Sequence, residues 1–144
     1  MKVSAVETLD YDYLLERAFA TLPKKASRAQ RFVLPKVNAI VIGSYTTIRN
    51  FKDIYDTLRR SPKHLSRFLL RKIGVAGSID ESSGTLTLHG RVSSSTLNRL
   101  LEIYVKKYVV CPTCGSWDTI LERKGRVWIL RCEACGAETS VEPV

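Results

Sequence analysis

The sequence predicts an α+β protein built from three successive parts. Apolar residues recur at helical spacing near the N-terminus, short apolar strands alternate with capped helices in the middle, and four cysteines form two closely spaced pairs near the C-terminus. We therefore expect an amphipathic helix in residues 1–22, a basic linker in 23–35, a small central α/β domain in 36–106 and a cysteine-rich ribbon in 107–144.

The first expected element is an amphipathic helix over residues 10–22. Asp10 can cap its start and Pro23 ends it. A helix of this length is marginal alone in water, so its apolar stripe needs a partner. It could pack on its own domain, but the basic, turn-rich stretch that follows favours docking on another protein. The docking residues are Tyr11, Leu14, Leu15, Ala18, Phe19 and Leu22.

The central domain begins with an apolar run at 37–43, which predicts a buried strand. Asn50 can open a helix through residue 58, and Ser61 followed by Pro62 opens a second that Gly74 can end. Residues 78–80 and 85–90 are typical of a hairpin, and the serines at 93–95 cap a last helix.

The cysteines form two C-x2-C-G knuckles with 17 residues between them. Zn²⁺ prefers four soft ligands in a tetrahedron, and paired thiolates on two tight turns supply them. Each following glycine can adopt a positive φ and turn backbone N–H groups toward the sulfurs. The segment between the knuckles predicts a strand, a turn at 124–125 and a second strand. We expect one structural zinc ion held by Cys111, Cys114, Cys132 and Cys135.

Other uses of the cysteines fit less well. Two disulfides suit a secreted protein, but the first residues resemble no signal peptide and no apolar run reaches membrane length. A redox C-x-x-C pair normally occurs once, before a helix. A catalytic zinc would keep an open position, which four thiolates do not leave. These observations favour a cytoplasmic protein without a membrane partner.

Positive charge is concentrated in the middle of the chain. The net charge is +9, and residues 24–75 hold 13 basic and 2 acidic residues. A basic segment beside a ribbon favours nucleic acid, although a solvated basic surface or pairing with an acidic partner would give the same pattern. His64 is expected on the same surface. The predicted RNA-binding residues are Arg60, Lys63, Arg67 and Arg71, on a stripe facing solvent.

No catalytic arrangement is recognisable. The sequence has no phosphate-binding glycine loop, no nucleophile with a nearby base and no paired carboxylates in apolar surroundings. We therefore expect a binding protein and not an enzyme.

Several stretches together carry a family resemblance. Residues 11–18 (YDYLLERA), 43–46 (GSYT), 50–51 (NF), 90–91 (GR) and 108–119 (YVVCPTCGSWDT) occur in the order helix, linker, α/β domain and ribbon. This arrangement resembles the beta subunit of archaeal translation initiation factor 2 over nearly the whole chain. The family often has Asn before a basic residue where this chain has Ser44 and Tyr45. Eukaryotic relatives carry lysine-rich blocks before the helix, which favours the archaeal form here.

The resemblance implies a non-enzymatic subunit of a heterotrimer. The gamma subunit would bind GTP and methionylated initiator tRNA, an alpha subunit would complete the complex, and beta would dock on gamma through its N-terminal helix. Beta would then support binding of the tRNA and the small ribosomal subunit.

Two other classes remain open on the sequence. The N-terminal part of initiation factor five, a GTPase activator, shares the pairing of α/β domain and ribbon, but it uses an arginine near its N-terminus where this chain has an acidic helix. Transcription-factor ribbons that assist RNA cleavage carry acidic residues at the hairpin tip, where this chain has residues 123–126 (RKGR).

Overall fold

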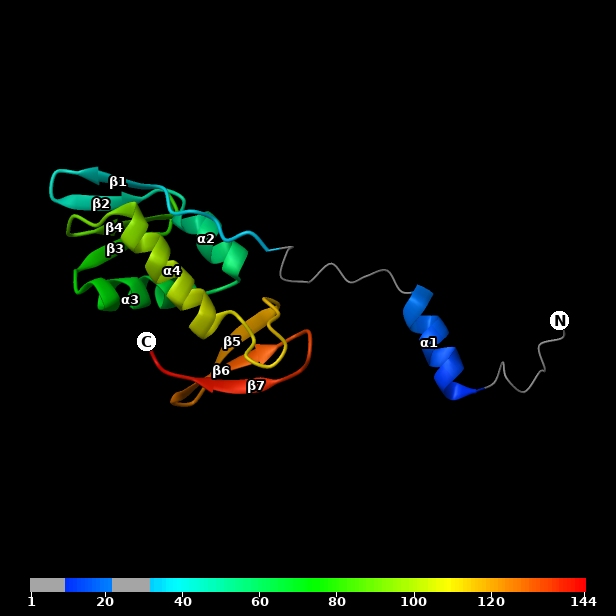
Figure 1. Ribbon diagram of the computed structural model, residues 1–144. Helices are drawn as coiled ribbons and strands as arrows, with labels where there is room; N and C mark the ends of the chain where they lie inside the picture. Colours follow the sequence, from blue (N-terminus) through cyan, green and yellow to red (C-terminus); the bar gives the residue numbers. More distant parts are fainter. Residues whose placement is uncertain (1–9, 22–31) are drawn as a thin grey trace. The chain divides into compact units, whose positions relative to one another are not determined.

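The computed structural model describes residues 10–21 and 32–144, which belong to two separate units. The first contains α1 (Tyr11–Thr21), labelled in Figure 1. Its start is capped as expected, since an Asp10 carboxylate oxygen accepts a hydrogen bond from the Asp12 backbone N–H at 3.3 Å. No residue of α1 is buried within its own unit, and Tyr11 and Phe19 are 72% and 66% exposed. Leu22 lies outside the described residues.

The second unit, residues 32–144, holds the other helices and strands. Figure 1 shows a mixed layer of helices and strands above a separate small sheet. The elements are β1 (Ala39–Ile42), β2 (Tyr45–Ile48), α2 (Phe51–Leu58), α3 (Pro62–Ile73), β3 (Gly77–Asp80), β4 (Thr85–Leu88), α4 (Ser94–Tyr108), β5 (Thr119–Lys124), β6 (Val127–Cys132) and β7 (Glu138–Val141).

The first sheet has the strand order β1-β2-β4-β3, and every pair is antiparallel. Alternation along β2 and β4 turns Thr46, Ile48, Leu86 and Leu88 to the buried face. Helix α3 packs on β3 and α4, while α2 packs on β4 and α3.

The prediction of a buried strand over 37–43 is wrong in two respects. Strand β1 covers only Ala39–Ile42 and lies at the edge of the sheet, with Ile42 64% exposed. Gly43, at φ 60°, reverses the chain into β2, which the sequence analysis did not predict. A short apolar run has the same composition at the edge of a sheet as at its centre, so the pattern alone could not decide.

The three central helices were predicted correctly. Helix α3 has Pro62 in its first turn and Gly74 in the left-handed conformation at its end. Helix α4 begins with a Ser93 side chain that accepts a hydrogen bond from the Thr96 N–H at 3.2 Å. Asn50 precedes α2 but does not cap it, because its side chain bonds the backbone of Lys36 and Asn38 instead.

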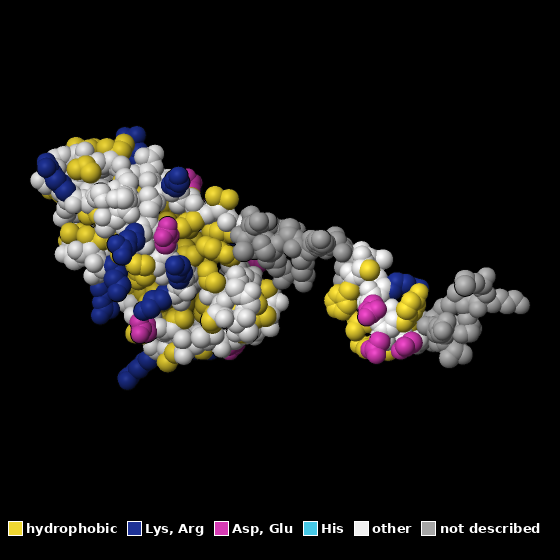
Figure 2. Space-filling model, in the orientation of Figure 1, with side chains coloured by type: hydrophobic (Ala, Val, Ile, Leu, Met, Phe, Trp, Pro, Cys, Tyr) yellow, Lys and Arg dark blue, Asp and Glu magenta, His cyan; other side chains and the backbone are white. Residues whose placement is uncertain are grey.

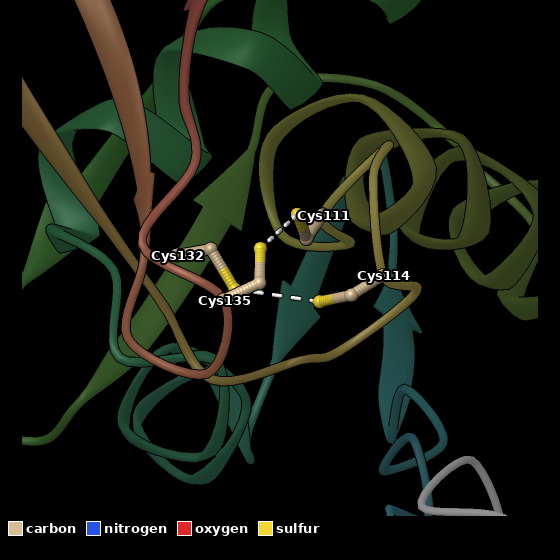
Figure 3. A group of neighbouring side chains, drawn as sticks. All are labelled: Cys111, Cys114, Cys132 and Cys135. Carbon is tan, nitrogen blue, oxygen red and sulfur yellow. Dashed lines mark hydrogen bonds between the residues drawn. The ribbon is translucent and has the colours of Figure 1, made fainter.

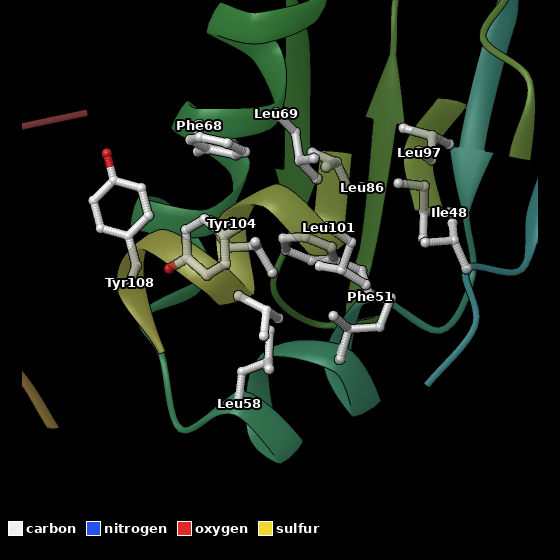
Figure 4. Packing of buried hydrophobic residues seen from close by; sticks show 14 of the residues in the cluster. Ile48, Phe51, Leu58, Phe68, Leu69, Leu86, Leu97, Leu101, Tyr104 and Tyr108 are labelled. Atoms are coloured by element: carbon white, nitrogen blue, oxygen red, sulfur yellow. The ribbon is translucent and has the colours of Figure 1, made fainter. Parts of the chain in front are cut away.

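The hydrophobic core lies between the first sheet and the three central helices. Figure 4 shows Leu86 and Ile48 facing residues from α2, α3 and α4. Towards the end of α4 the core becomes aromatic, with the Phe68 and Tyr104 ring centroids 5.1 Å apart. Leu65, Leu86, Leu88, Leu97 and Tyr104 are fully buried.

The second sheet has the order β5-β6-β7 and forms the ribbon. The β5–β6 hairpin turns at residues 125–126, one position later than predicted, and β7 was not predicted. The expected boundary at 106/107 falls within α4, and the two sheets belong to one compact unit. Within the described ranges, no helix combines the length and apolar character needed to cross a membrane.

Candidate metal centre and basic surface

The two cysteine pairs sit on turns with the same backbone hydrogen bonds. The Gly115 N–H donates to the Cys111 carbonyl at 2.9 Å, and the Gly136 N–H donates to the Cys132 carbonyl at 3.0 Å. Both glycines have positive φ, 68° and 75°, as the sequence predicted. The first knuckle follows α4 and the second joins β6 to β7.

The four sulfur atoms converge on one point between these turns (Figure 3). All lie within 4.8 Å of one another. The Cys111 and Cys135 sulfurs are 3.7 Å apart, and those of Cys114 and Cys132 are 3.6 Å apart. A tetrahedral ion with metal–sulfur bonds of about 2.3 Å separates its ligands by about 3.8 Å. The donor set and its spacing therefore suit a tetrahedral metal ion.

The backbone around Cys111 favours its thiolate. Burial opposes ionisation, but N–H groups of Cys114 and Thr113 point at the sulfur and lower the pKa of the Cys111 thiol to about 6. Cys111 and Cys132 are buried, whereas Cys114 and Cys135 are exposed. Four thiolates fill a tetrahedron, so the site could stabilise the ribbon but offers no position for a substrate.

Arg60 joins the central helices to the ribbon. Its side chain is 5% exposed and donates to carbonyl oxygens of Tyr108, at 2.8 Å, and Thr119, also at 2.8 Å. It also donates to the Thr119 hydroxyl and to the carbonyls of Leu58 and Arg59. The guanidinium therefore satisfies carbonyls at the ends of α2 and α4 and at the start of β5.

The prediction that Arg60 faces solvent on a helical stripe is therefore wrong. Arg59 adopts a left-handed conformation, φ 53°, after α2, and α3 begins only at Pro62. Arg60 thus lies between two helices, so the four-residue spacing to His64 does not place both on one face.

His64 is also buried, contrary to its expected place on the surface. It lies one turn before Phe68, on the inward face of α3, and its Nδ1 is 2.9 Å from the Tyr104 hydroxyl. Its ring contacts Trp128 of the ribbon, with centroids 4.8 Å apart. Burial, together with the charges of Arg60 and Arg67, lowers the pKa of His64 to about 4.

The other predicted RNA-binding residues, Lys63, Arg67 and Arg71, are exposed on α3. Figure 2 shows Lys and Arg side chains over α3 and α4 on one face of this unit. The sequence analysis missed the contacts of α3 with the ribbon through Trp128. Trp128 follows a basic hairpin tip, and this pairing of an aromatic with cations was the available indication.

Comparison with known proteins defines the class to which the chain belongs. The family model for the domain found in eIF-5 and eIF-2B matches residues 23–138, which include the central elements and most of the ribbon. The fold and the four-cysteine site are thus those of a domain shared by initiation factors.

Similar proteins narrow this class. The chain is 48% identical to translation initiation factor 2 subunit beta of Staphylothermus marinus, over 92% of each chain. It is 44% identical to the protein of that name from Aeropyrum pernix, over 97% of this chain and 94% of the other. It is 46% identical to that of Methanopyrus kandleri, over 92% and 94%. The chain belongs to the family of archaeal translation initiation factor 2 beta subunits.

Purified protein is expected to contain one zinc ion per chain, measurable by elemental mass spectrometry. Cys111→Ser should lower this content and disorder the ribbon, because a small ribbon depends on its metal for stability. Thr113→Ala is the matched control, since it changes the same turn without removing a sulfur ligand. A fully folded ribbon in metal-free protein, seen in amide NMR spectra, would contradict the prediction.

Replacing Arg60 with Ala is expected to lower the free energy of unfolding by roughly 1–3 kcal/mol for each buried carbonyl left without a donor. Arg60→Lys should restore little of this, because an ammonium group cannot reproduce the planar fork. Denaturant titration of metal-loaded protein measures the effect. Arg59→Ala, at the exposed neighbour, should change stability by less than about 1 kcal/mol. Equal losses for both alanine variants would refute the role of Arg60.

His64 makes stability depend on pH. Its pKa is about 4 in the folded protein and 6.5 as an ordinary value, so the unfolded chain binds more protons between these limits. The free energy of unfolding should therefore fall, by up to about 3 kcal/mol, as the pH drops from 6.5 to 4. The difference between wild type and His64→Gln isolates this contribution from metal release, which both share. Parallel pH profiles would rule it out.

Proposed function

We propose that the chain is the beta subunit of a heterotrimeric, GTP-dependent initiation factor that delivers methionylated initiator tRNA to the small ribosomal subunit. The observation that carries the proposal is the agreement of three relatives in name and in extent, over 92–97% of this chain. The proposed subunit is cytoplasmic and acts by binding, without catalysis of its own.

Helix α1 is the proposed contact with the gamma subunit. Tyr11, Leu15 and Phe19 share one face by helical spacing, and all three are exposed within their unit. An isolated helix of 11 residues is marginal in water, so its stability is best supplied by a partner groove. Leu14 and Ala18 lie on the same face.

The second unit is proposed to support binding of the initiator tRNA and the ribosome. Lys63, Arg67 and Arg71 are exposed cations on one side of α3 and can neutralise phosphates without reading base sequence. Arg60 is left out of this surface, because its N–H groups are already bonded to backbone carbonyls and a hydroxyl.

The four cysteines are proposed to hold one structural zinc ion. Zinc fits the site because it accepts four thiolates in a tetrahedron and takes no part in redox chemistry. Its role would be to stabilise the ribbon, which has only three short strands.

A GTPase activator is the nearest alternative, since the matching family model covers initiation factor five as well. The beta-subunit interpretation is favoured because all the similar proteins compared above carry that name over nearly their full length. The transcription-factor alternative lacks support, because the hairpin tip carries Arg123, Lys124 and Arg126 and no acid to hold Mg²⁺.

Binding to the gamma subunit tests the proposal directly. Leu15→Ala or Phe19→Ala should each weaken binding by roughly 2–4 kcal/mol if the side chain fills a buried pocket at the interface. Calorimetry with purified gamma subunit measures the change.

The matched control is Arg17→Ala, on the polar face of the same helix, which should bind nearly as wild type. Deletion of residues 1–22 should abolish binding. A deleted chain that binds gamma at full affinity would overturn the role of α1.

A further inference from the structure

A cavity of about 330 Å³ lies where the first turns of α3 approach the ribbon. Lys63, His64 and Arg67 line it from α3, and Arg123 and Arg126 line it from the β5–β6 hairpin. Trp128, Ser61, Pro143 and Val144 complete its wall. The cations thus come from segments about 60 residues apart in the sequence.

The side-chain charge in this cationic cavity is unbalanced. Its lining has four Lys or Arg side chains and no Asp or Glu side chain. Over the described residues, the ion pairs within 4.0 Å involve Arg59, Lys107, Lys124 and Arg131, none of which lines it. Glu81 shares a neighbouring cavity with Lys63 and Arg67 but forms no ion pair with either. Four cations held close without acidic side chains repel one another, which an anionic ligand would relieve.

His64 gives an independent indication of a ligand. It is 6% exposed, and its Nε2 is the one buried side-chain nitrogen or oxygen in the described part of the chain without a hydrogen-bond partner. When the Tyr104 hydroxyl donates to Nδ1, the ring proton is on Nε2, which becomes a donor without an acceptor. Buried donors of this kind are rare unless a ligand or water completes them.

We propose that this cavity binds the phosphodiester backbone of RNA, held jointly by α3 and the ribbon hairpin. The proposal rests on the proposed function, and it assigns RNA contact to a composite site instead of to one helical stripe. Arg71 is not part of it, because Arg71 lines a different cavity with Lys72, Lys107 and Glu142.

Phosphate suits the cavity better than a protein carboxylate does. Guanidinium groups bind phosphate oxygens in pairs, and the N-terminus of α3, at Ser61, adds the positive end of a helix dipole. The partly exposed ring of Trp128 stands beside these cations, and an aromatic within a basic groove is typical of single-stranded nucleic-acid sites.

The test is the affinity of the full, metal-loaded chain for a short single-stranded RNA, followed across salt concentration. Arg67→Gln on α3 and Arg123→Gln on the hairpin should each weaken binding about fivefold at about 0.1 M salt and reduce the salt slope by ~0.7. The double variant should lose less than the product of the single losses, because both side chains contact one ligand. Arg99→Gln, an exposed arginine of α4 outside the cavity, is the control and should change little.

Fluorescence localises the bound RNA independently. In a Trp117→Phe background, Trp128 is the remaining tryptophan, and RNA should change its emission with the same dissociation constant. In a Trp128→Phe background, Trp117, which stacks on Phe32 with centroids 4.1 Å apart, should not respond.

Three results would overturn the inference: cavity variants that behave like Arg99→Gln, single losses that multiply in the double variant, or inorganic phosphate that binds while RNA does not compete. The first would leave gamma binding through α1 intact, so the proposed function would stand. Conversely, a chain lacking residues 1–22 that keeps full gamma affinity would refute the docking role without changing the RNA result.

Discussion

The buried guanidinium of Arg60 is the interaction on which the second unit depends. It donates to the carbonyls of Tyr108 and Thr119, and so fixes the end of α4 against the first strand of the ribbon. The Thr119 hydroxyl continues this network by donating to the Val109 carbonyl. Because Val109 lies two residues before Cys111, the same network also positions the first cysteine turn. A charge bonded mainly to backbone carbonyls needs no acidic partner, so the contact is set by backbone geometry.

The basic surface follows from this arrangement. Fixing the ribbon beside α3 brings the β5–β6 hairpin, with Arg123 and Arg126, towards Lys63 and Arg67. Neither segment alone would concentrate charge to this extent. The aromatic rings of His64, Tyr108 and Trp128 fill the space behind these cations and exclude water from it. A low-dielectric wall behind the cations strengthens their field at the surface.

The sequence specified local structure well and long-range contacts poorly. The caps at Pro62, Gly74 and Ser93 and the spacing of the cysteines act within a few residues, so their outcome could be read directly. Strand β2 was missed because its four residues, Tyr45–Ile48, are too few to show a clear alternation. Helical spacing was extended across the break at Arg59, which misplaced Arg60, and the solvent-facing side of α3 was drawn too wide, which misplaced His64. The cavity combines residues about 60 positions apart, which no local pattern reports.

The separation of Arg60 from Thr119 has a consequence for synthesis on the ribosome. The two residues are 59 positions apart, so Arg60 leaves the exit tunnel well before its acceptors. Domains generally fold from the N-terminal end as the chain emerges. The central sheet and helices can then assemble while the end of α4 still lacks its closing contact, and the guanidinium stays hydrated until β5 arrives. Maturation of the central domain therefore waits for the ribbon, and an interrupted chain would display a charged, unfilled seam that distinguishes it from the finished protein.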